Sequence, residues 1–537
     1  MYFSKKILYS VIISLTWILT SCSDLTESPR SSQTIQILDS PDGFERTVNA
    51  TYSTLRNWYG RERSHVLSTF GTDTWTVATV VSFFYANDYN SDLSPRDPQG
   101  VFQRVWSDHY KGINTANEVI EQAPNVDMDE SVKTQRIAEV RFLRAMYYFR
   151  LVRMFGDVPL QLEISRNVLT EVTRAPIEAV YDAIIADLRF AIDNLPSHAD
   201  QQFGRASQEA SQHLLSEVFL TRGNQGDYQQ AEQMAEAVIN SGNFRLLNDY
   251  AELWIPGNER NEEAIFNVGY SANEIVNAQG NRSHLYFLAA YDEAPGMTRV
   301  KEIGRPWRRY KPTPFLARSF GKYDSRWEKS FKDFFLSNDE PSIPTDPNGE
   351  KLWALGDTAV WVPREQVSQE ERDRRPPIVI RDIDEWNAIN FPTLTKHLDP
   401  NRATVNDPSG IRDFQVFRLA ETYLLAAEAE IRQGKLDEAA TSLNVVRRRA
   451  AKVGFEDEME LTPSEVNIDT LLNEAGRELA GEMKRWFRLK RLDKLIERVR
   501  LYNERAAPNI QPFHRLRPIP QQEIDRATNE LPQNPGY

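Results

Sequence analysis

Side chains that could hold a metal ion are scattered along this sequence. The seven histidines include no pair four residues apart, and the chain has a single cysteine, so the spacings of zinc sites are missing. The run Asp346-Pro-Asn-Gly-Glu350 partly resembles the start of a calcium loop, but its spacing is wrong and an Asx turn explains it better. We therefore predict neither a metal site nor a cofactor.

Motifs of catalysis are equally sparse. The sequence contains no glycine-rich phosphate loop and no nucleophile elbow. The sequence does not exclude a pair of carboxylates suited to glycoside hydrolysis. The chain has 77 acidic residues, and two of them can be close in the fold while distant in the sequence.

Cys22 is the side chain with the clearest predicted chemistry. Lys5 and Lys6 precede the apolar run Ile7–Leu19, which ends in Leu-Thr-Ser-Cys22, the layout of a secretory signal. Small residues before a lone cysteine resemble a bacterial lipobox, which implies cleavage before Cys22 and its acylation. We expect a signal peptide at 1–21 and a lipidated polar tether at 22–41, anchored stably by more than one acyl chain. The alternative is an ordinary signal peptide with an incidental cysteine.

Composition limits the partners of the chain. Its formal net charge is −13, which disfavours nucleic acids and anionic lipids. Without a second cysteine, packing must stabilise the fold. Eleven Trp, twenty Tyr and twenty-six Phe exceed what a helical core requires, so some of these aromatic residues are expected at a binding surface.

The secondary-structure elements of the chain are predicted to be mainly α-helices. From Phe44, apolar residues recur at helical spacing, first as Phe44, Val48, Tyr52 and Leu55. Further helical segments are expected over 101–120, 132–155 and 176–195.

Two helical hairpins repeat within the sequence. An Ala-rich helix ends at a glycine in 216–223 and again in 427–434, and a short polar turn and a second helix follow in both places. The pattern resembles the tetratricopeptide hairpin, in which small residues let helices approach closely. With looser pairs over 44–120 and 132–195, about four repeats are expected.

The composition and periodicity of the sequence change between residues 244 and 414. Proline becomes frequent, helical periodicity fades, and short β-like runs occur at 264–268 and 378–380. Long irregular stretches inside a compact domain are usually functional. We divide the mature chain into helical regions at 42–243 and 415–537 and an irregular, candidate ligand-binding insertion at 244–414.

A basic run lies between Lys484 and Arg500. Acidic residues such as Glu482, Asp493 and Glu497 are interleaved with it. The pattern favours a solvated, salt-bridged helix face over a polyanion site.

Four blocks of sequence carry a family resemblance. The segment 141–160, from Arg-Phe-Leu-Arg-Ala-Met-Tyr-Tyr-Phe to Gly-Asp-Val-Pro-Leu, resembles the central signature of SusD/RagB nutrient-binding lipoproteins. Residues 418–429, 474–491 and 516–537 resemble the C-terminal blocks of that family, in the same order. One departure is Arg488, where relatives often have Asp.

The resemblance implies a lipid-anchored, surface-exposed protein of the bacterial outer membrane. Such proteins bind nutrient, here predicted to be oligosaccharide or polysaccharide, and serve as a lid on a SusC-like TonB-dependent barrel. They bind and do not catalyse, so we predict that this chain is not an enzyme. A peptide-capture protein on the same fold and, more remotely, an all-α glycoside hydrolase stay open as alternatives.

The family also implies where ligand residues lie, in the loop after the first helix and in the irregular insertion. A sugar requires aromatic faces beside hydrogen-bonding groups. The residues of this kind in the two regions are Asp73, Trp75, Tyr85, Asn87, Trp307, Arg309, Tyr310 and Trp353.

Overall fold

The structure is a computed structural model that describes residues 40–79, 82–167 and 169–537. The predicted signal peptide, Cys22 and nearly all of the predicted tether lie outside these residues. Helix accounts for 47% and strand for 7%, which confirms the mainly α fold class. No helix in the described ranges is both long and apolar enough to span a bilayer.

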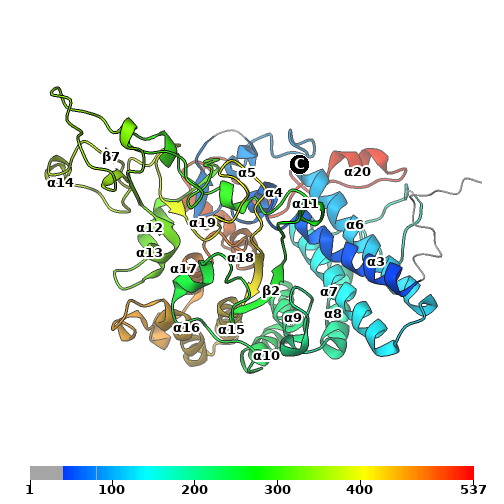
Figure 1. The fold of residues 1–537 in the computed structure, drawn as a ribbon. Coiled ribbons are helices and arrows are strands. Elements are labelled where there is room, and N and C mark those ends of the chain that lie inside the picture. The colour runs from blue at the N-terminus through cyan, green and yellow to red at the C-terminus, as the bar shows by residue number, and fades with distance from the viewer. Residues whose placement is uncertain (1–39, 80–81, 168) are drawn as a thin grey trace, which may run out of the picture.

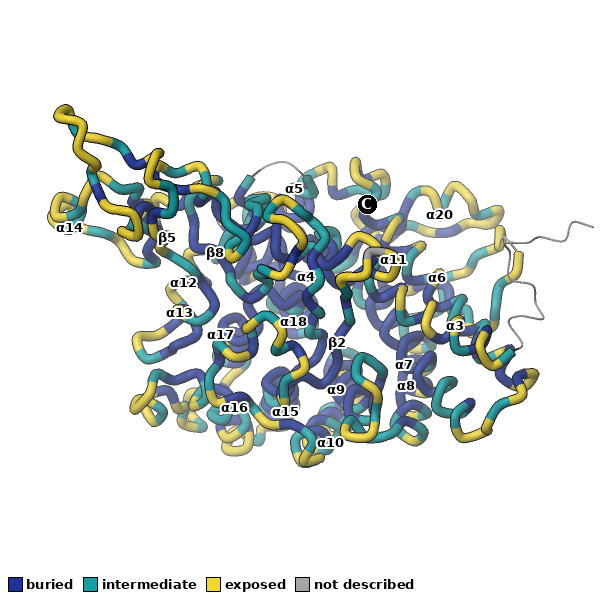
Figure 2. The backbone as a smooth tube through the Cα atoms, in the orientation of Figure 1, coloured by how far each residue is buried: buried dark blue, intermediate teal, exposed yellow. Residues whose placement is uncertain are grey.

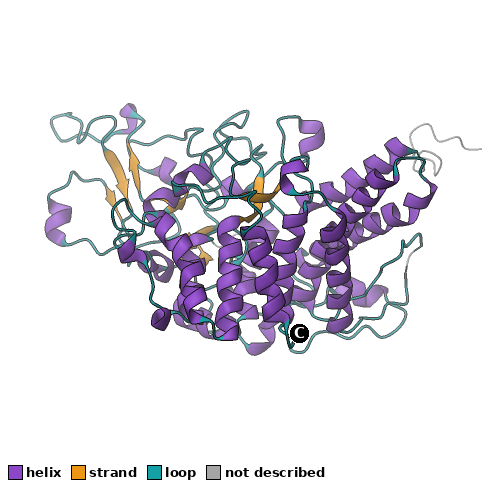
Figure 3. Cartoon of the chain, turned by 90° about the horizontal axis from the view of Figure 1, so that it is seen from below, coloured by secondary structure: helices purple, strands orange, loops and turns teal. Residues whose placement is uncertain are grey.

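Long helices stand side by side in one row, each in contact with the next (Figures 1 and 3). Their spatial order is α3 (Pro41–Ser53), α6 (Val101–Gln122), α7 (Glu130–Phe155), α8 (Ile177–Asn194), α9 (Gln208–Arg222), α10 (Asp227–Ile239), α15 (Leu419–Gln433) and α16 (Leu436–Ala450). Successive members form the pairs α3/α6, α7/α8, α9/α10 and α15/α16. This arrangement is consistent with the predicted tetratricopeptide-like repeats.

Capping residues set the ends of these helices. The Asp129 carboxylate accepts a hydrogen bond from the backbone N–H of Ser131 at 2.8 Å and starts α7. Helices α9 and α15 end at Gly223 and Gly434, whose φ values of 68° and 77° lie in the left-handed region that favours glycine. These are the two glycines of the repeated hairpin, so both predicted helix ends are confirmed.

The C-terminal helices connect the row to the N-terminal part of the chain. They are α17 (Ile468–Glu478), α18 (Arg485–Arg491), α19 (Leu495–Tyr502) and α20 (Gln521–Arg526). Helix α17 contacts α15 and α16, α18 contacts α4 (Glu62–Ser68), and α20 contacts α6. The two ends of the sequence therefore share one core.

The basic run within α18 and α19 is salt-bridged, but the prediction of a solvated helix face was wrong. Arg485 and Arg498 are buried against Asp73, and Arg491 donates to Glu428 at 2.7 Å. Arg488, the departure from the family pattern, is buried 3.8 Å from Glu421. The physical reason is that Trp486, Leu489 and Leu495 on the same short helices are core residues. Because these helices pack into the core, the neighbouring arginines are buried too and require carboxylate partners.

Between α10 and α15 the chain forms short elements. Strand β2 (Ala264–Val268) pairs antiparallel with β9 (Phe414–Arg418), so this stretch leaves and rejoins the helix row at one place. The predicted β-like runs are confirmed as β2 and β7 (Val379–Ile380). The other short elements are α11 (Glu274–Asn277), α12 (Pro314–Ser319), α13 (Arg326–Ser330), α14 (Gln369–Asp373), β4 (Phe331–Lys332), β5 (Phe334–Leu336), β6 (Thr358–Trp361) and β8 (Thr393–Leu394).

Part of this stretch forms a distal lobe around β5, β6, β7 and α14, at the upper left of Figure 1. Much of its backbone is exposed (Figure 2). The lobe has a small core of its own, which includes Tyr291, Phe335, Trp353 and Val360.

Candidate ligand-binding site

A cavity of about 430 Å³ opens beside α4, the start of α6 and the segment that follows α11. Figure 1 shows α4, α6 and α11 near one another on the upper side of the molecule. The cavity is lined by Arg61, Glu62, Arg63, Phe83, Pro98, Gln99, Val101, Arg104, Gln279, Arg282, Tyr286 and Trp307. Its size is in the range of small-ligand sites, and residues from three distant parts of the sequence form it.

Two aromatic rings form one wall of this cavity. The ring centroids of Tyr286 and Trp307 lie 5.9 Å apart at an interplanar angle of 57°. Backbone hydrogen bonds from Trp307 to Leu285 and from Arg309 to Tyr286, both 2.9 Å, fix the two segments together. Trp307 is only partly buried, so its ring is available to the apolar face of a ligand.

Charged and amide groups form the rest of the lining. Arg61 is buried, and its Nη1 donates to the side-chain oxygen of Gln279 at 3.1 Å. Arg63 forms an ion pair with Asp108 at 2.8 Å. These guanidinium and amide groups can hydrogen-bond the hydroxyl or acidic groups of a ligand.

Glu62 is the one carboxyl group in the lining. Burial raises its pKa to about 7, although the guanidinium of Arg309, 2.9 Å away, acts in the opposite direction. The carboxyl therefore changes its charge near neutral pH, which is unusual for a glutamate.

The two predicted stretches of ligand residues meet in the structure. Strand β1 (Trp75–Val77) pairs antiparallel with β3 (Tyr310–Pro312), with Trp75 opposite Pro312 and Val77 opposite Tyr310. Of the predicted residues, Trp307 lines the cavity, and Arg309 lies beside it with its guanidinium carbon 5.3 Å from the Trp307 ring centroid.

The other predicted residues are covered by protein. Trp75, Tyr310 and Trp353 are buried, and Trp353 belongs to the core of the distal lobe, apart from the rest. Tyr85 is also buried and donates to Asp97 at 2.8 Å. Their role in ligand binding stays a prediction, one that requires these side chains to become accessible.

Asp73 and Asn87 are likewise enclosed. Asp73 is held by Arg485 and Arg498, and burial is outweighed by these two cations, so the pKa of Asp73 lies below its usual value. The side-chain amide of Asn87 donates to Asp88 at 2.9 Å. Both residues have partners within the protein.

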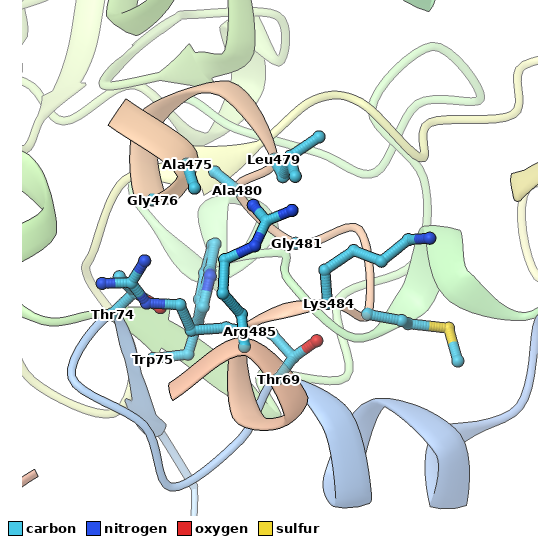
Figure 4. A pocket seen from close by; sticks show the side chains of 12 residues that line it. Thr69, Thr74, Trp75, Ala475, Gly476, Leu479, Ala480, Gly481, Lys484 and Arg485 are labelled. Atoms are coloured by element: carbon cyan, nitrogen blue, oxygen red, sulfur yellow. The ribbon is translucent and has the colours of Figure 1, made fainter. Parts of the chain in front are cut away.

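Figure 4 shows what surrounds Trp75. The space there is a cavity of about 10 Å³, lined also by Thr69, Thr74, Gly476 and Arg485. This volume accommodates about one water molecule and no sugar ring. Trp75 is therefore a core residue in this structure.

Several lining residues were not predicted from the sequence, among them Tyr286, Arg61, Arg104 and Arg282. The sequence offers a weak signal for one of these residues, Arg61, since an Arg-Glu-Arg run at 61–63 directly precedes the buried residues 64–68 of α4. Nothing in the sequence places Arg104 or Arg282 next to that run, because the cavity forms only when the three segments fold together.

Comparison with known proteins gives a consistent result. Residues 262–537 match the model of the SusD family, and residues 25–220 match a model described as starch-binding associating with outer membrane. SusD-like protein P2 of Formosa agariphila is 28% identical, over 98% of each chain. The starch-binding protein SusD of Bacteroides thetaiotaomicron is 24% identical, over 83% of this chain and 79% of that protein. The solved structure of a laminarin-binding SusD-like protein has a TM-score of 0.69 at 26% identity and covers 93% of this chain and all of that one.

Proposed function

The chain belongs to the SusD family, and from this premise we propose that it binds an oligosaccharide or polysaccharide in the cavity beside Tyr286 and Trp307. The observation that carries the proposal is the combination of the partly exposed Trp307 ring, backed by the buried Tyr286, with guanidinium and amide groups around one volume of about 430 Å³. Aromatic faces pack against the apolar C–H face of a sugar, and the guanidinium and amide groups form hydrogen bonds with its polar substituents. The names of a starch-binding and a laminarin-binding relative agree with this ligand class.

Of the residues predicted from the sequence, we propose Trp307 and Arg309 as ligand contacts. The lining residues of the cavity come from the region 42–243 and from the insertion 244–414. We propose that the residues of the insertion determine which glycan is bound. A rigid helix row with an irregular stretch attached at β2 and β9 suits such a division of roles.

The proposal includes a membrane anchor and a partner. Acylation at Cys22 would hold the chain at the outer membrane, and a SusC-like TonB-dependent barrel would receive the captured glycan. The exposed side of the helix row offers a long, continuous surface for that barrel. The description of the family model that matches residues 25–220 agrees with an outer-membrane location.

A glycan array tests the binding proposal. The full-length protein, solubilised in mild detergent, is expected to bind a defined set of oligosaccharides, and Trp307→Ala is expected to lose these signals. The matched control is Phe334→Ala, which removes an exposed aromatic ring in the distal lobe and is expected to keep them. An array without a signal, accompanied by capture of peptides from a peptide library, favours the peptide-binding alternative instead.

Incubation of the best ligand with the protein separates binding from catalysis. We expect the ligand to be recovered at its original length by chromatography after prolonged incubation. Shortened products that persist in highly purified protein would support the glycoside hydrolase alternative.

Co-purification tests the partner. Extraction in mild detergent from cells grown on the inducing glycan is expected to yield a complex with a TonB-dependent barrel. Recovery of the monomer alone under these conditions would contradict the transport role.

A further inference from the structure

The charge of the cavity differs from that of the whole chain. Four arginines and one glutamate line it, so the lining carries a net charge of three positive units when Glu62 is ionised. The chain as a whole has a formal net charge of −13. A local excess of cations in an acidic protein attracts anions to that place.

Most of these arginines have no carboxylate partner among the described residues. Arg61 donates to the carbonyl oxygen of Arg56 and to Gln279, and Arg282 donates to the carbonyl oxygen of Gln279 at 3.3 Å, all neutral groups. In the described part of the chain, neither of them nor Arg104 forms an ion pair, and only Arg63 does, with Asp108. Glu62 is engaged outside the lining by Arg309.

Several other arginines of the core are matched with acids. Arg485 is paired with Asp73, Arg418 with Glu478 and Arg491 with Glu428. Buried charges are normally paired, because taking an isolated charge out of water is costly. Arg61, which is 8% exposed, and the buried Arg150, Arg402 and Arg517 form no ion pair among the described residues, and of these four only Arg61 lines the cavity.

The cations of the cavity also lie close enough to repel one another. Burial is the main reason why the pKa values of Arg61 and Arg63 are lowered, and neighbouring cations add to it. Arg282 lowers the pKa of Arg61, while Arg61 and Arg104 lower that of Arg63, and the Asp108 carboxylate acts on both in the opposite direction. An anion placed among these groups would relieve the repulsion and supply the missing counter-charge.

We propose that the cavity selects oligosaccharides that carry carboxylate or sulfate groups. This inference rests on the proposed glycan-binding function. Guanidinium groups bind planar carboxylates and sulfate oxygens through paired, charge-assisted hydrogen bonds. They only donate, so several of them around one volume fit a ligand rich in acceptors better than a neutral sugar, whose hydroxyls also need acceptors. Trp307, supported by the buried ring of Tyr286, would stack on the sugar ring while the arginines bind its acidic substituents.

Calorimetry with matched ligands tests the proposal. The ligands are a neutral oligosaccharide, a uronic-acid-containing one and a sulfated one of equal length, titrated into the detergent-solubilised full-length protein. At least one acidic ligand is expected to bind about 10- to 100-fold more tightly than the neutral one, the effect expected of charge-assisted hydrogen bonds. The advantage should shrink as salt is raised. The carboxylated and sulfated ligands show which acidic group is selected.

Two variants assign the effect to the cavity. Arg104→Gln combined with Arg282→Gln removes two guanidinium groups that form no ion pair in the described residues, and is expected to abolish the preference, so that acidic and neutral ligands bind the variant with equal affinity. The control is Arg374→Gln, which removes one positive charge at the C-terminal end of α14 in the distal lobe, where Arg374 is 66% exposed, and is expected to keep the preference.

The outcomes separate this inference from the proposed function. If neutral and acidic ligands bind with equal affinity, or if the double variant keeps the preference, the inference is wrong and glycan binding stands. If no oligosaccharide of either kind binds, both are wrong.

Discussion

Asp73 and Arg485 are 412 positions apart in the sequence and form a two-fold hydrogen-bonded ion pair in the core, with oxygen–nitrogen distances of 2.7 and 2.5 Å. Arg498 donates to the same carboxylate at 2.7 Å. The loop before β1 is thereby fixed to α18 and α19. One acid thus binds two buried cations from the C-terminal part of the chain, and Asp469 supplies a second carboxylate to Arg498 at 2.8 Å.

We expect Asp73→Asn to destabilise the protein by about 3–5 kcal/mol, because it leaves the buried Arg485 without its counter-charge and Arg498 with Asp469 as its one carboxylate partner among the described residues. The measurement is the free energy of unfolding in urea. The control is Asp42→Asn, since Asp42 pairs with Arg46 on the surface of α3, and its effect should stay within about 0.5 kcal/mol. A variant at Asp73 with the stability of the wild type but without glycan binding would instead support a direct ligand role for this residue.

Trp307→Ala should weaken glycan binding by about 1–3 kcal/mol, by analogy with aromatic stacking on nucleobases. This corresponds to roughly 5- to 150-fold in affinity. The reason is the loss of the more accessible of the two rings in the cavity wall. Calorimetry with the best array ligand measures the change, and circular dichroism verifies folding. Unchanged affinity in a folded variant would remove Trp307 from the site.

The pH dependence of the free energy of unfolding should reveal the raised pKa of Glu62. Its pKa in the folded protein is about 7, above the value of 4.5 for an unperturbed glutamate. The folded state therefore holds a proton that the unfolded state has lost between these values, and the stability contributed by this group falls as pH rises towards and through 7. The groups that face it are Arg309, Arg282, Tyr286 and Tyr310.

Glu62→Gln should remove this dependence. Between pH 4.5 and pH 8, the free energy of unfolding of the wild type is expected to fall by on the order of 3 kcal/mol relative to that of the variant. Urea unfolding of both proteins across this range measures the difference, and all other titrating groups are common to the two. A constant difference across the range would show that Glu62 titrates normally.

Cys22→Ala tests the predicted anchor. Without the thiol, the chain cannot be acylated, and we expect it to leave the membrane fraction in cells that lack the partner barrel. Fractionation followed by immunoblotting measures this. Continued association with the outer membrane under these conditions would mean that the lipobox interpretation is wrong.

The helices could be predicted well from the sequence because their signals are local. The segment predicted over 132–155 is α7, which begins at Glu130 and ends at Phe155, and the β-like run at 264–268 is β2. Helical periodicity, capping residues and glycines at helix ends are all readable within a few residues of each position.

The candidate site could be predicted only in part, because it depends on contacts between distant segments. Trp307 was selected for its residue type and lies at the cavity, whereas Trp75 was selected in the same way and lies in the core. A loop aspartate such as Asp73 has the same local sequence whether it faces solvent or an arginine more than 400 residues away. The basic run in α18 and α19 was misjudged for the same reason.

The helix row is continuous in space but interrupted in the sequence, since α10 ends at Ile239 and its neighbour α15 begins at Leu419. During synthesis, the first six helices of the row emerge with one apolar face of α10 uncovered until the whole insertion has followed. Contacts of such large sequence separation slow folding and expose intermediates to aggregation. The contact between α10 and α15 is therefore expected to form late in folding.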